Sequence, residues 1–140
     1  MSEILLSAAM IVRDEEHRLD ECLASIEDFV DEVVVVDTGS TDATKRIARR
    51  RGARVFDFSW CDDFAAARNR SLELARGQWI LYIDADERVC QGDRRRLEPL
   101  LRDPRYVGAW VLLRALGPML SSWGTNSLAD FHGIGSPDMA

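Results

Sequence analysis

Four short, largely apolar runs divide the first 90 residues, and each ends in a string of charged or turn-forming residues. The runs are Leu5–Val12, Val33–Val36, Val55–Phe58 and Trp79–Ile83. Runs of this length that are rich in branched apolar residues are typical of strands covered on both faces. A segment with helical spacing follows each of the first three. Strands that alternate with helices need crossover connections, so we predict an α/β fold with an open, mainly parallel sheet and helices on both faces.

Three helices are expected between these strands. Apolar residues recur at helical spacing over Leu19–Ile26, and Asp14 and Glu15 before them suit a helix N-terminus by capping and by charge. The second helix is expected over Ala43–Arg51 and the third over Phe64–Ala75.

The pattern weakens after residue 90. A short helix over Leu97–Leu101 and a fifth strand near Tyr106–Leu113 are expected, whereas glycines and prolines interrupt residues 115–140 without sustained periodicity. A chain of 140 residues is about one average domain. We therefore expect one domain over residues 1–114 and an irregular or disordered tail over residues 115–140.

The absence of several sequence signals excludes whole classes of protein. No apolar run approaches the roughly 18 residues that span a bilayer, and the N-terminus lacks the basic start of a signal peptide. A cytoplasmic location is expected, with peripheral association at the inner membrane left open. The three cysteines, Cys22, Cys61 and Cys90, are widely spaced and are expected to be reduced, buried thiols.

Charge is unevenly distributed along the chain. The net charge is −6, and residues 1–42 hold twelve acidic but only two basic residues. The arginine clusters at 49–51 and 94–96 lack the interleaved aromatic residues of single-strand binders, so we interpret them as solvated helix faces and expect no nucleic-acid partner. The chain also lacks the G-x-G-x-x-G and P-loop motifs, so any nucleotide site must be built differently.

The carboxyl ends of the predicted strands mark the expected site, because ligands of open parallel sheets collect there. Asp84 and Asp86 leave the fourth strand two residues apart, so both carboxylates can face the same side. Two adjacent anions repel each other unless a cation binds them, and hard oxygen ligands suit Mg²⁺ or Mn²⁺. A solvated acidic turn is the alternative interpretation.

Two further residues are candidates for ligand binding. Asp37 ends a strand of four valines, and its carboxylate can accept a hydrogen bond from the N–H edge of a nucleobase. For Ser40 and Asp42, just after it, capping of the next helix is the simpler interpretation. Arg68 lies among small residues in the third helix, where it can offset the acidic residues or bind a diphosphate.

In their order and spacing, four segments resemble the N-terminal half of the family 2 glycosyltransferases, which are inverting nucleotide-sugar enzymes with the GT-A fold. The segments are Ala9–Glu16, Val34–Asp42, Trp60–Asn69 and Trp79–Glu87. The likeness is strongest to the bacterial branch that includes lipopolysaccharide-core and peptide glycosyltransferases. It implies a Rossmann-like GT-A domain over residues 1–114 that is incomplete at its C-terminal side, since nothing after Arg114 resembles the acceptor half.

The resemblance also implies roles for single residues. Asp37 would contact the nucleobase of the donor, and Arg68 would lie beside the nucleotide. Asp84 would lie by the ribose, and Asp86 would bind the divalent metal on the diphosphate.

The loop after the first strand is implicated in the same way. Arg13 and Glu15 would line the base pocket, with Asp14 between them at a position where the family often has Asn. No catalytic base is assigned, because the family normally supplies it from the half that has no counterpart here.

The expected function is transfer of a sugar, with inversion and with Mn²⁺ or Mg²⁺, from a nucleoside-diphosphate donor to an unknown acceptor. A UDP-sugar is the expected donor, and a homo-oligomer is left open. One alternative is a nucleotide-sugar-binding module or truncated fragment without turnover. A second is phosphoryl transfer with Asp84 or Asp86 as the phosphate acceptor.

Overall fold

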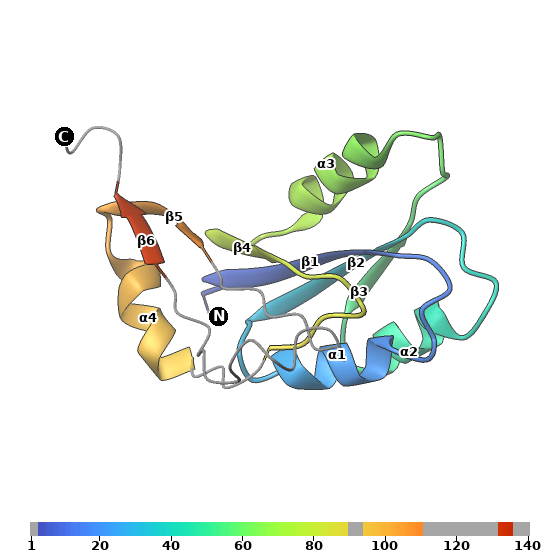
Figure 1. The fold of residues 1–140 in the computed structure, drawn as a ribbon, viewed down its shortest axis with the longest axis horizontal. Coiled ribbons are helices and arrows are strands. Elements are labelled where there is room, and N and C mark those ends of the chain that lie inside the picture. The colour runs from blue at the N-terminus through green and yellow to red at the C-terminus, as the bar shows by residue number, and fades with distance from the viewer. Residues whose placement is uncertain (1–2, 90–93, 111–131, 136–140) are drawn as a thin grey trace, which may run out of the picture. The chain divides into compact units, whose positions relative to one another are not determined.

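The parallel sheet expected from the sequence forms the centre of the N-terminal part of the chain. The computed structural model describes residues 3–89, 94–110 and 132–135, and the chain divides into two compact units, Met1–Val89 and Cys90–Ala140. In the first unit all neighbouring strands pair in parallel, in the order β3-β2-β1-β4 (Figure 1). The strands are β1 (Leu6–Val12), β2 (Glu32–Asp37), β3 (Arg54–Asp57) and β4 (Trp79–Tyr82). This confirms the predicted α/β fold.

Burial within the sheet follows strand position. The central strands β1 and β2 are almost completely buried, and Val34, Val35 and Val36 have no exposed surface. In β4, which has a single neighbour in the described sheet, three residues are half-buried, and Tyr82 is 41% exposed. The expectation that the fourth strand is fully buried is therefore wrong, because an outer strand receives cover from fewer elements.

Helices lie on both sides of the sheet, as predicted. Figure 1 shows α3 (Phe64–Leu74) on one side and α1 (Leu19–Ile26) and α2 (Thr44–Arg50) on the other. The apolar stripe of α1 is buried, as its spacing indicated. By contrast, α3 buries only the small residues Ala67 and Ser71, so this helix packs on the sheet through a narrow strip.

The expected cap of α1 is absent, because the loop after β1 turns elsewhere. The position before α1 is Arg18, which makes no side-chain capping bond. Asp14 has a φ of +51°, in the left-handed region that Asn and Asp tolerate better than most residues. Its carboxylate instead accepts the amide of Thr41 at 2.8 Å. The left-handed conformation also gives a physical reason why the family that the sequence resembles often has Asn at this position.

A buried cluster holds the amino ends of the strands together. The Glu32 side chain is 3% exposed and accepts hydrogen bonds from Ser7 Oγ (2.6 Å), Arg54 (2.6 Å) and Arg76 Nε (2.7 Å). Burial by itself would raise the pKa of Glu32, but these donors outweigh it and lower the pKa to about 2. Ser7 Oγ also accepts the amide of Gly77, where a Cβ would lie 2.6 Å from that oxygen.

The register aligns the carboxyl ends of the strands. Val12 pairs with Asp37, and Asp37 pairs with Asp57 on its other side, so the ends of β1, β2 and β3 lie at one edge. On the other side of β1, Ala9 pairs with Tyr82 of β4. The direction of strand addition reverses between β1 and β4, which makes this the switch point where open α/β sheets bind ligands.

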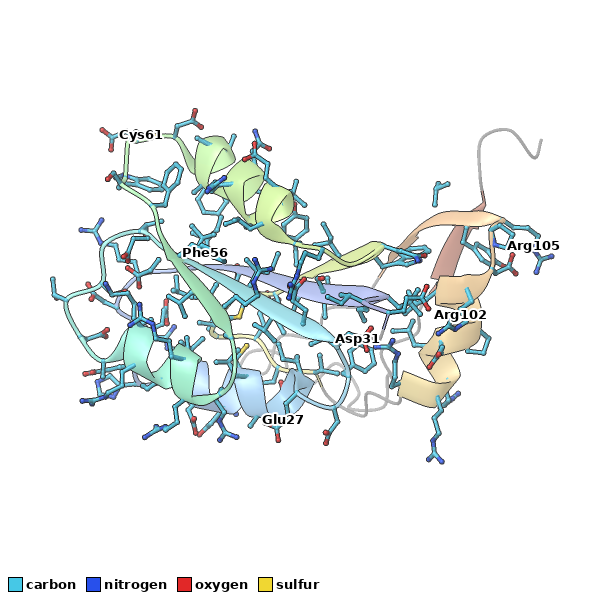
Figure 2. All side chains as sticks on the ribbon, turned by 180° about the vertical axis from the view of Figure 1, so that it is seen from behind. Glu27, Asp31, Phe56, Cys61, Arg102 and Arg105 are labelled. Carbon is cyan, nitrogen blue, oxygen red and sulfur yellow. The ribbon has the colours of Figure 1, made fainter. Side chains whose placement is uncertain are left out.

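The two described cysteines differ in exposure. Cys22 is buried, as predicted, whereas Cys61 is exposed, and Figure 2 shows it in the connection between β3 and α3. The expectation of burial is wrong for Cys61 because that connection runs over the surface, as loops generally do. Cys90 lies outside the described residues.

The second unit contains a helix and a two-stranded sheet. The helix α4 (Arg94–Arg102) buries Leu97 and Leu101, and β5 (Tyr106–Trp110) pairs antiparallel with β6 (His132–Gly135). The fifth strand is therefore not part of the parallel sheet. The four described residues of the predicted irregular tail form the strand β6. The sequence periodicity did not indicate this strand, which forms because it pairs with β5. No helix in the described ranges is long and apolar enough to cross a membrane.

Candidate functional site at the carboxyl ends of the strands

Asp37 lines a cavity of about 320 Å³ that opens beside the ends of β2 and β3. Its side chain is almost entirely buried. Oδ1 accepts the amides of Gly39 (2.9 Å) and Ser40 (2.8 Å), an arrangement that the positive φ of Gly39 allows. Oδ2 is buried and has no hydrogen-bond partner among the described residues. A buried carboxylate oxygen without a donor is costly, so this atom calls for a ligand with an N–H or O–H group.

The rest of this cavity combines a flat apolar surface with a cation. Trp60 is 41% exposed, and its Nε1 donates to Asp62 at 3.0 Å. Lys45 pairs with Asp57 at 3.1 Å. The complete lining is Asp37, Thr38, Gly39, Ser40, Lys45, Asp57, Phe58, Ser59 and Trp60. An aromatic ring, a cation and a buried acceptor without a partner suit a planar heterocycle that carries both an N–H group and carbonyl oxygens.

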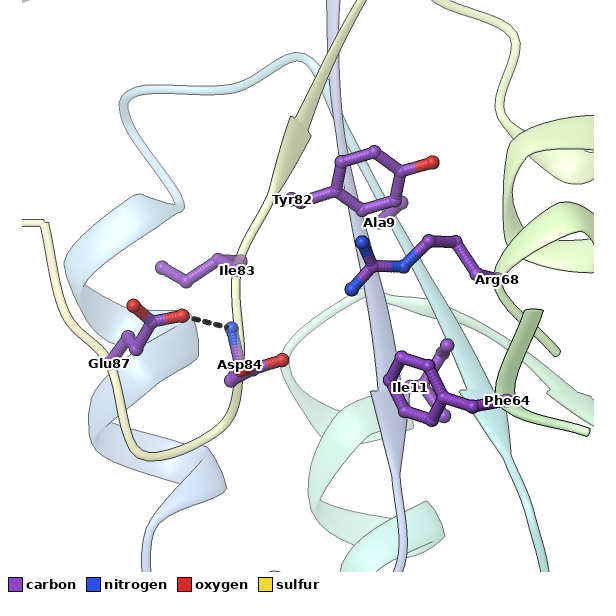
Figure 3. A pocket seen from close by; sticks show the side chains of 8 residues that line it. All are labelled: Ala9, Ile11, Phe64, Arg68, Tyr82, Ile83, Asp84 and Glu87. Atoms are coloured by element: carbon purple, nitrogen blue, oxygen red, sulfur yellow. Dashed lines mark hydrogen bonds between the residues drawn. The ribbon is translucent and has the colours of Figure 1, made fainter. Parts of the chain in front are cut away.

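A second cavity, of about 150 Å³, lies at the switch point between β1 and β4 (Figure 3). Its lining comprises Ala9, Ile11, Phe64, Arg68, Tyr82, Ile83, Asp84 and Glu87. The Arg68 guanidinium carbon lies 5.2 Å from the centre of the Phe64 ring and 4.7 Å from that of Tyr82. The cavity therefore has a cation on the α3 side and carboxylates on the side of the segment after β4.

Three carboxylates converge in the turn that follows β4. Ligand atoms of Asp84, Asp86 and Glu87 lie within 4.8 Å of one another. The turn is held by the Glu87 amide, which donates to the Asp84 carbonyl at 2.9 Å, and by the Asp84 amide, which donates to Glu87 Oε1 at 2.8 Å. Asp84 and Asp86 are exposed and Glu87 is half-buried. Clustered hard oxygen donors that are open to solvent fit a divalent cation such as Mg²⁺ or Mn²⁺.

The negative charge of this turn affects the nearest buried group. Cys22 Sγ donates to the Asp84 carbonyl at 3.5 Å. Burial, together with the charges of Glu87, Asp86 and Asp84, raises the pKa of Cys22 to about 12. The thiol therefore stays protonated at neutral pH, and it supports the turn without acting as a nucleophile or metal ligand.

The loops after β1 and β2 are bound to each other. Ser40 Oγ accepts the amide of Asp14 at 2.9 Å, so Ser40 does not cap α2 as expected, because its hydroxyl is turned to the neighbouring loop. Asp42 does accept the amide of Thr44, the first residue of α2, at 2.9 Å. The hydroxyl of Thr44 in turn accepts the amide of Glu15 at 2.8 Å. These bonds fix the loop that carries Gly39 and Ser40.

The predicted site residues thus fall into four groups. Asp37 lines the first cavity, and Arg68 and Asp84 line the second. Asp86 belongs to the acidic turn. Arg13 is exposed and Glu15 half-buried in the loop after β1, and neither lines either cavity.

Sequence reasoning missed several residues of the site. Phe64 and Tyr82 flank Arg68, Glu87 completes the acidic turn, and Lys45 lines the first cavity. The spacing of Glu87, three residues after Asp84, was a usable signal, because a tight turn brings such positions together. Phe64 and Tyr82 come from different elements, so no local spacing links them.

A parallel sheet of this topology, with a cavity at the switch point and an acidic turn after the outer strand, is typical of α/β proteins of the GT-A class. The chain belongs to glycosyl transferase family 2, whose family model matches residues 7–135. The family and the fold implied by the four strand-end segments are thereby confirmed.

Known relatives extend well beyond the matched region. The chain is 46% identical over 107 residues to a TPR repeat-containing protein of Synechococcus elongatus, covering 76% of this chain and 27% of that protein. It is 37% identical over 119 residues to an uncharacterized glycosyltransferase of Rickettsia bellii, covering 81% of this chain and 40% of that protein. The chain thus spans between about a quarter and two fifths of the length of these relatives.

A solved structure with the same fold carries ligands. Glucosyl-3-phosphoglycerate synthase from Mycobacterium tuberculosis in complex with uridine diphosphate matches with a TM-score of 0.60 and 27% identity, covering 74% of this chain and 42% of that one. The same enzyme in complex with Mn²⁺, UDP-glucose and phosphoglyceric acid matches with a TM-score of 0.53 and 29% identity, over 59% and 33% of the two chains.

Proposed function

We propose that this chain carries the donor site of a metal-dependent glycosyltransferase that takes a sugar from a nucleoside diphosphate, with UDP as the carrier. The observation that carries the proposal is the buried Oδ2 of Asp37, which lines the first cavity and has no hydrogen-bond partner among the described residues. Membership of glycosyl transferase family 2 supports it, as does the UDP complex of the mycobacterial synthase.

The hydrogen bonds that the Asp37 carboxylate already accepts favour uracil over guanine as its ligand. Guanine offers two adjacent N–H donors and pairs best with both oxygens of a carboxylate. Oδ1 of Asp37 is already engaged by the amides of Gly39 and Ser40, so only Oδ2 is available. The single imide N–H of uracil matches one acceptor. The ammonium of Lys45, on the same cavity, can donate to a flanking carbonyl oxygen.

We propose that the two cavities together hold the remaining parts of the donor. With the base beside Asp37, the ribose would lie toward Asp84 and the diphosphate between Arg68 and the acidic turn. Asp84, Asp86 and Glu87 would hold the divalent cation. When bound, the cation neutralises charge that develops on the departing nucleoside diphosphate. Arg68 would neutralise the same oxygens from the opposite side.

The proposed reaction is a single displacement with inversion. The acceptor oxygen forms a bond to the anomeric carbon as the bond from that carbon to the β-phosphate oxygen breaks. The proton of the acceptor hydroxyl leaves to a base, which we do not assign to any described residue. Arg13 and Glu15, in the loop that is bound to α2, are proposed to border the nucleotide site from the β1 side.

Calorimetric titration of the 140-residue chain with UDP, with and without Mn²⁺, tests the donor site. We expect binding that Mn²⁺ strengthens and that GDP does not match. A folded sample that binds no UDP under either condition would overturn the proposal. Release of UDP from UDP-glucose that is lost in Asp86→Ala would then separate an enzyme from a module that only binds the donor.

A further inference from the structure

In the described part of the protein, the side chain of Arg68 lies against two aromatic rings and has no hydrogen-bond or ion-pair partner. Its guanidinium carbon lies 5.2 Å from the centre of the Phe64 ring and 4.7 Å from that of the Tyr82 ring. Figure 3 shows the guanidinium between the two rings, one from α3 and one from the end of β4. Both distances are within the range of cation–π attraction.

The exposure of the two rings is unusual for their size. Phe64 is 52% exposed and Tyr82 is 41% exposed, although large aromatic side chains normally bury most of their surface. They therefore contribute little to the core. Their shared neighbour is Arg68, at the wall of the second cavity.

This environment leaves the hydrogen-bonding edge of Arg68 available. Within the described residues the side chain of Arg68 makes no hydrogen bond or ion pair, whereas that of Arg70 on the same helix pairs with Glu73 at 3.3 Å. The two ring contacts involve no hydrogen bond, so the N–H donors of the guanidinium remain available to a ligand. Contact with the rings also restricts a long side chain that otherwise samples many rotamers.

The opposite wall of the cavity indicates which ligand the guanidinium meets. Asp84 and Glu87 lie there and belong to the acidic turn with the proposed cation. A group placed between a guanidinium and a carboxylate-bound divalent cation is attracted to both when it carries negative charge itself. A diphosphate has that charge, and its oxygens match the donors of arginine.

We propose that Phe64 and Tyr82 form an aromatic clamp that holds Arg68 in place for the diphosphate of the donor, so that both rings are positioning residues for nucleotide binding. The clamp rests on the proposed function, since it requires a diphosphate in the second cavity. Its effect is preorganisation, because the arginine loses its side-chain freedom before the ligand arrives.

The test compares UDP, which carries the diphosphate, with uridine, which does not. The full chain is titrated in the presence of Mn²⁺, by calorimetry for UDP and by NMR chemical shifts for the weaker ligand uridine. The variants are Phe64→Leu, Tyr82→Leu, their double variant, Tyr82→Phe, Arg68→Met and the control Arg70→Gln, which lies outside both cavities.

The clamp predicts a specific pattern. Loss of either ring should weaken UDP binding by about three- to fivefold, and loss of both by about tenfold or more, as expected for exposed cation–π contacts. Arg68→Met should weaken UDP binding at least as much as the double variant. The affinity for uridine and the melting temperature should stay unchanged in all of these variants. Tyr82→Phe, which keeps the ring, should bind UDP with the affinity of the unmodified chain.

Two results would overturn the clamp and leave the donor site intact. In one, Phe64→Leu and Tyr82→Leu bind UDP as the unmodified chain does. In the other, the binding of uridine and the binding of UDP weaken equally, which would mean that the rings contact the base or serve general packing. Failure of the unmodified chain to bind UDP at all would instead overturn the proposed function.

Discussion

The Oδ1 of Asp14 accepts the amide of Thr41 at 2.8 Å and thereby joins the loop after β1 to the loop after β2. The amide of Asp14 donates in turn to Ser40 Oγ, and the amide of Ser40 donates to Oδ1 of Asp37. A chain of hydrogen bonds therefore runs from a residue with positive φ to the carboxylate that lines the first cavity. The position of the Asp37 acceptor depends on this connection.

Three substitutions of Asp14 distinguish the stabilisation by its side-chain hydrogen bond from the effect of its left-handed backbone conformation. Asp14→Ala should lower the free energy of unfolding by about 1–2 kcal/mol, because it loses an acceptor and places alanine in the left-handed region. Asp14→Gly should lose only the contribution of the acceptor, and Asp14→Asn should stay within about 0.5 kcal/mol of the unmodified protein, since Asn keeps both features. Urea unfolding measures all three. Equal losses in the Ala and Asn variants would contradict the role of the side-chain oxygen.

Replacement of Asp37 should separate stability from binding. Asp37→Asn keeps an oxygen for the amides of Gly39 and Ser40 but removes the charge of a carboxylate whose Oδ2 is buried without a donor. The free energy of unfolding should stay level or rise by about 1 kcal/mol. UDP affinity should fall by about tenfold or more, because the amide nitrogen would face the imide N–H. A variant that loses stability but binds UDP normally would rule out this role of Oδ2.

The acidic turn is expected to act through a metal ion. Asp86→Asn should abolish the strengthening of UDP binding by Mn²⁺ and change the free energy of unfolding by less than about 0.5 kcal/mol, because Asp86 is exposed. Asp28→Asn removes a carboxylate that is equally exposed and far from the turn in sequence, and serves as the matched control. Calorimetry with and without Mn²⁺ checks both variants. Persistence of the Mn²⁺ effect in Asp86→Asn would remove this residue from the metal site.

Glu32 should make the stability of the protein sensitive to acid. The pKa of Glu32 is lowered from an ordinary 4.5 to about 2 in the folded chain, so between these values the unfolded chain binds more protons than the folded one. The contribution of Glu32 is therefore complete above about pH 4.5 and is lost as the pH falls toward 2. Thermal unfolding should show the melting temperature falling across this window.

The matching substitution is Glu32→Gln, which leaves Arg54 and Arg76 without their carboxylate. At pH 7 it should cost about 3–5 kcal/mol, as is usual when one partner of a buried ion pair is removed. The difference from the unmodified chain should narrow as the pH falls toward 2. A difference that is constant across that range would show that the ionised form of Glu32 does not provide the stabilisation.

The parts of the fold that local sequence determines were predicted well. The valines of β2, the apolar stripe of α1 and the Asp84–Asp86 pair each depend on residues close in sequence. The Glu32 cluster joins residues from Ser7 to Gly77, and no local pattern reveals such contacts. The left-handed turn at Asp14 was missed for a similar reason. An acidic residue before a helix usually acts as a cap, and here the neighbouring loop competes successfully for its carboxylate.

The second unit shows the same dependence on distant contacts. β6 is four residues long and contains two glycines, so its sequence does not favour a strand. Antiparallel pairing with β5 supplies the hydrogen bonds that define it. Likewise, in the first unit, Phe64 and Tyr82 meet around Arg68 only because α3 packs on β1 and β2 and β4 is the neighbour of β1.

The Glu32 carboxylate, which accepts several hydrogen bonds, and Oδ2 of Asp37, which accepts none among the described residues, lie at opposite ends of β2. This strand is six residues or roughly 20 Å long. Substitutions at the two ends share no contact, so their effects on stability should add. Adaptation to a different nucleotide could thus proceed by changes around Asp37 while the Glu32 end maintains folding. The same separation offers protein engineers a region in which stability can be raised without redesigning recognition.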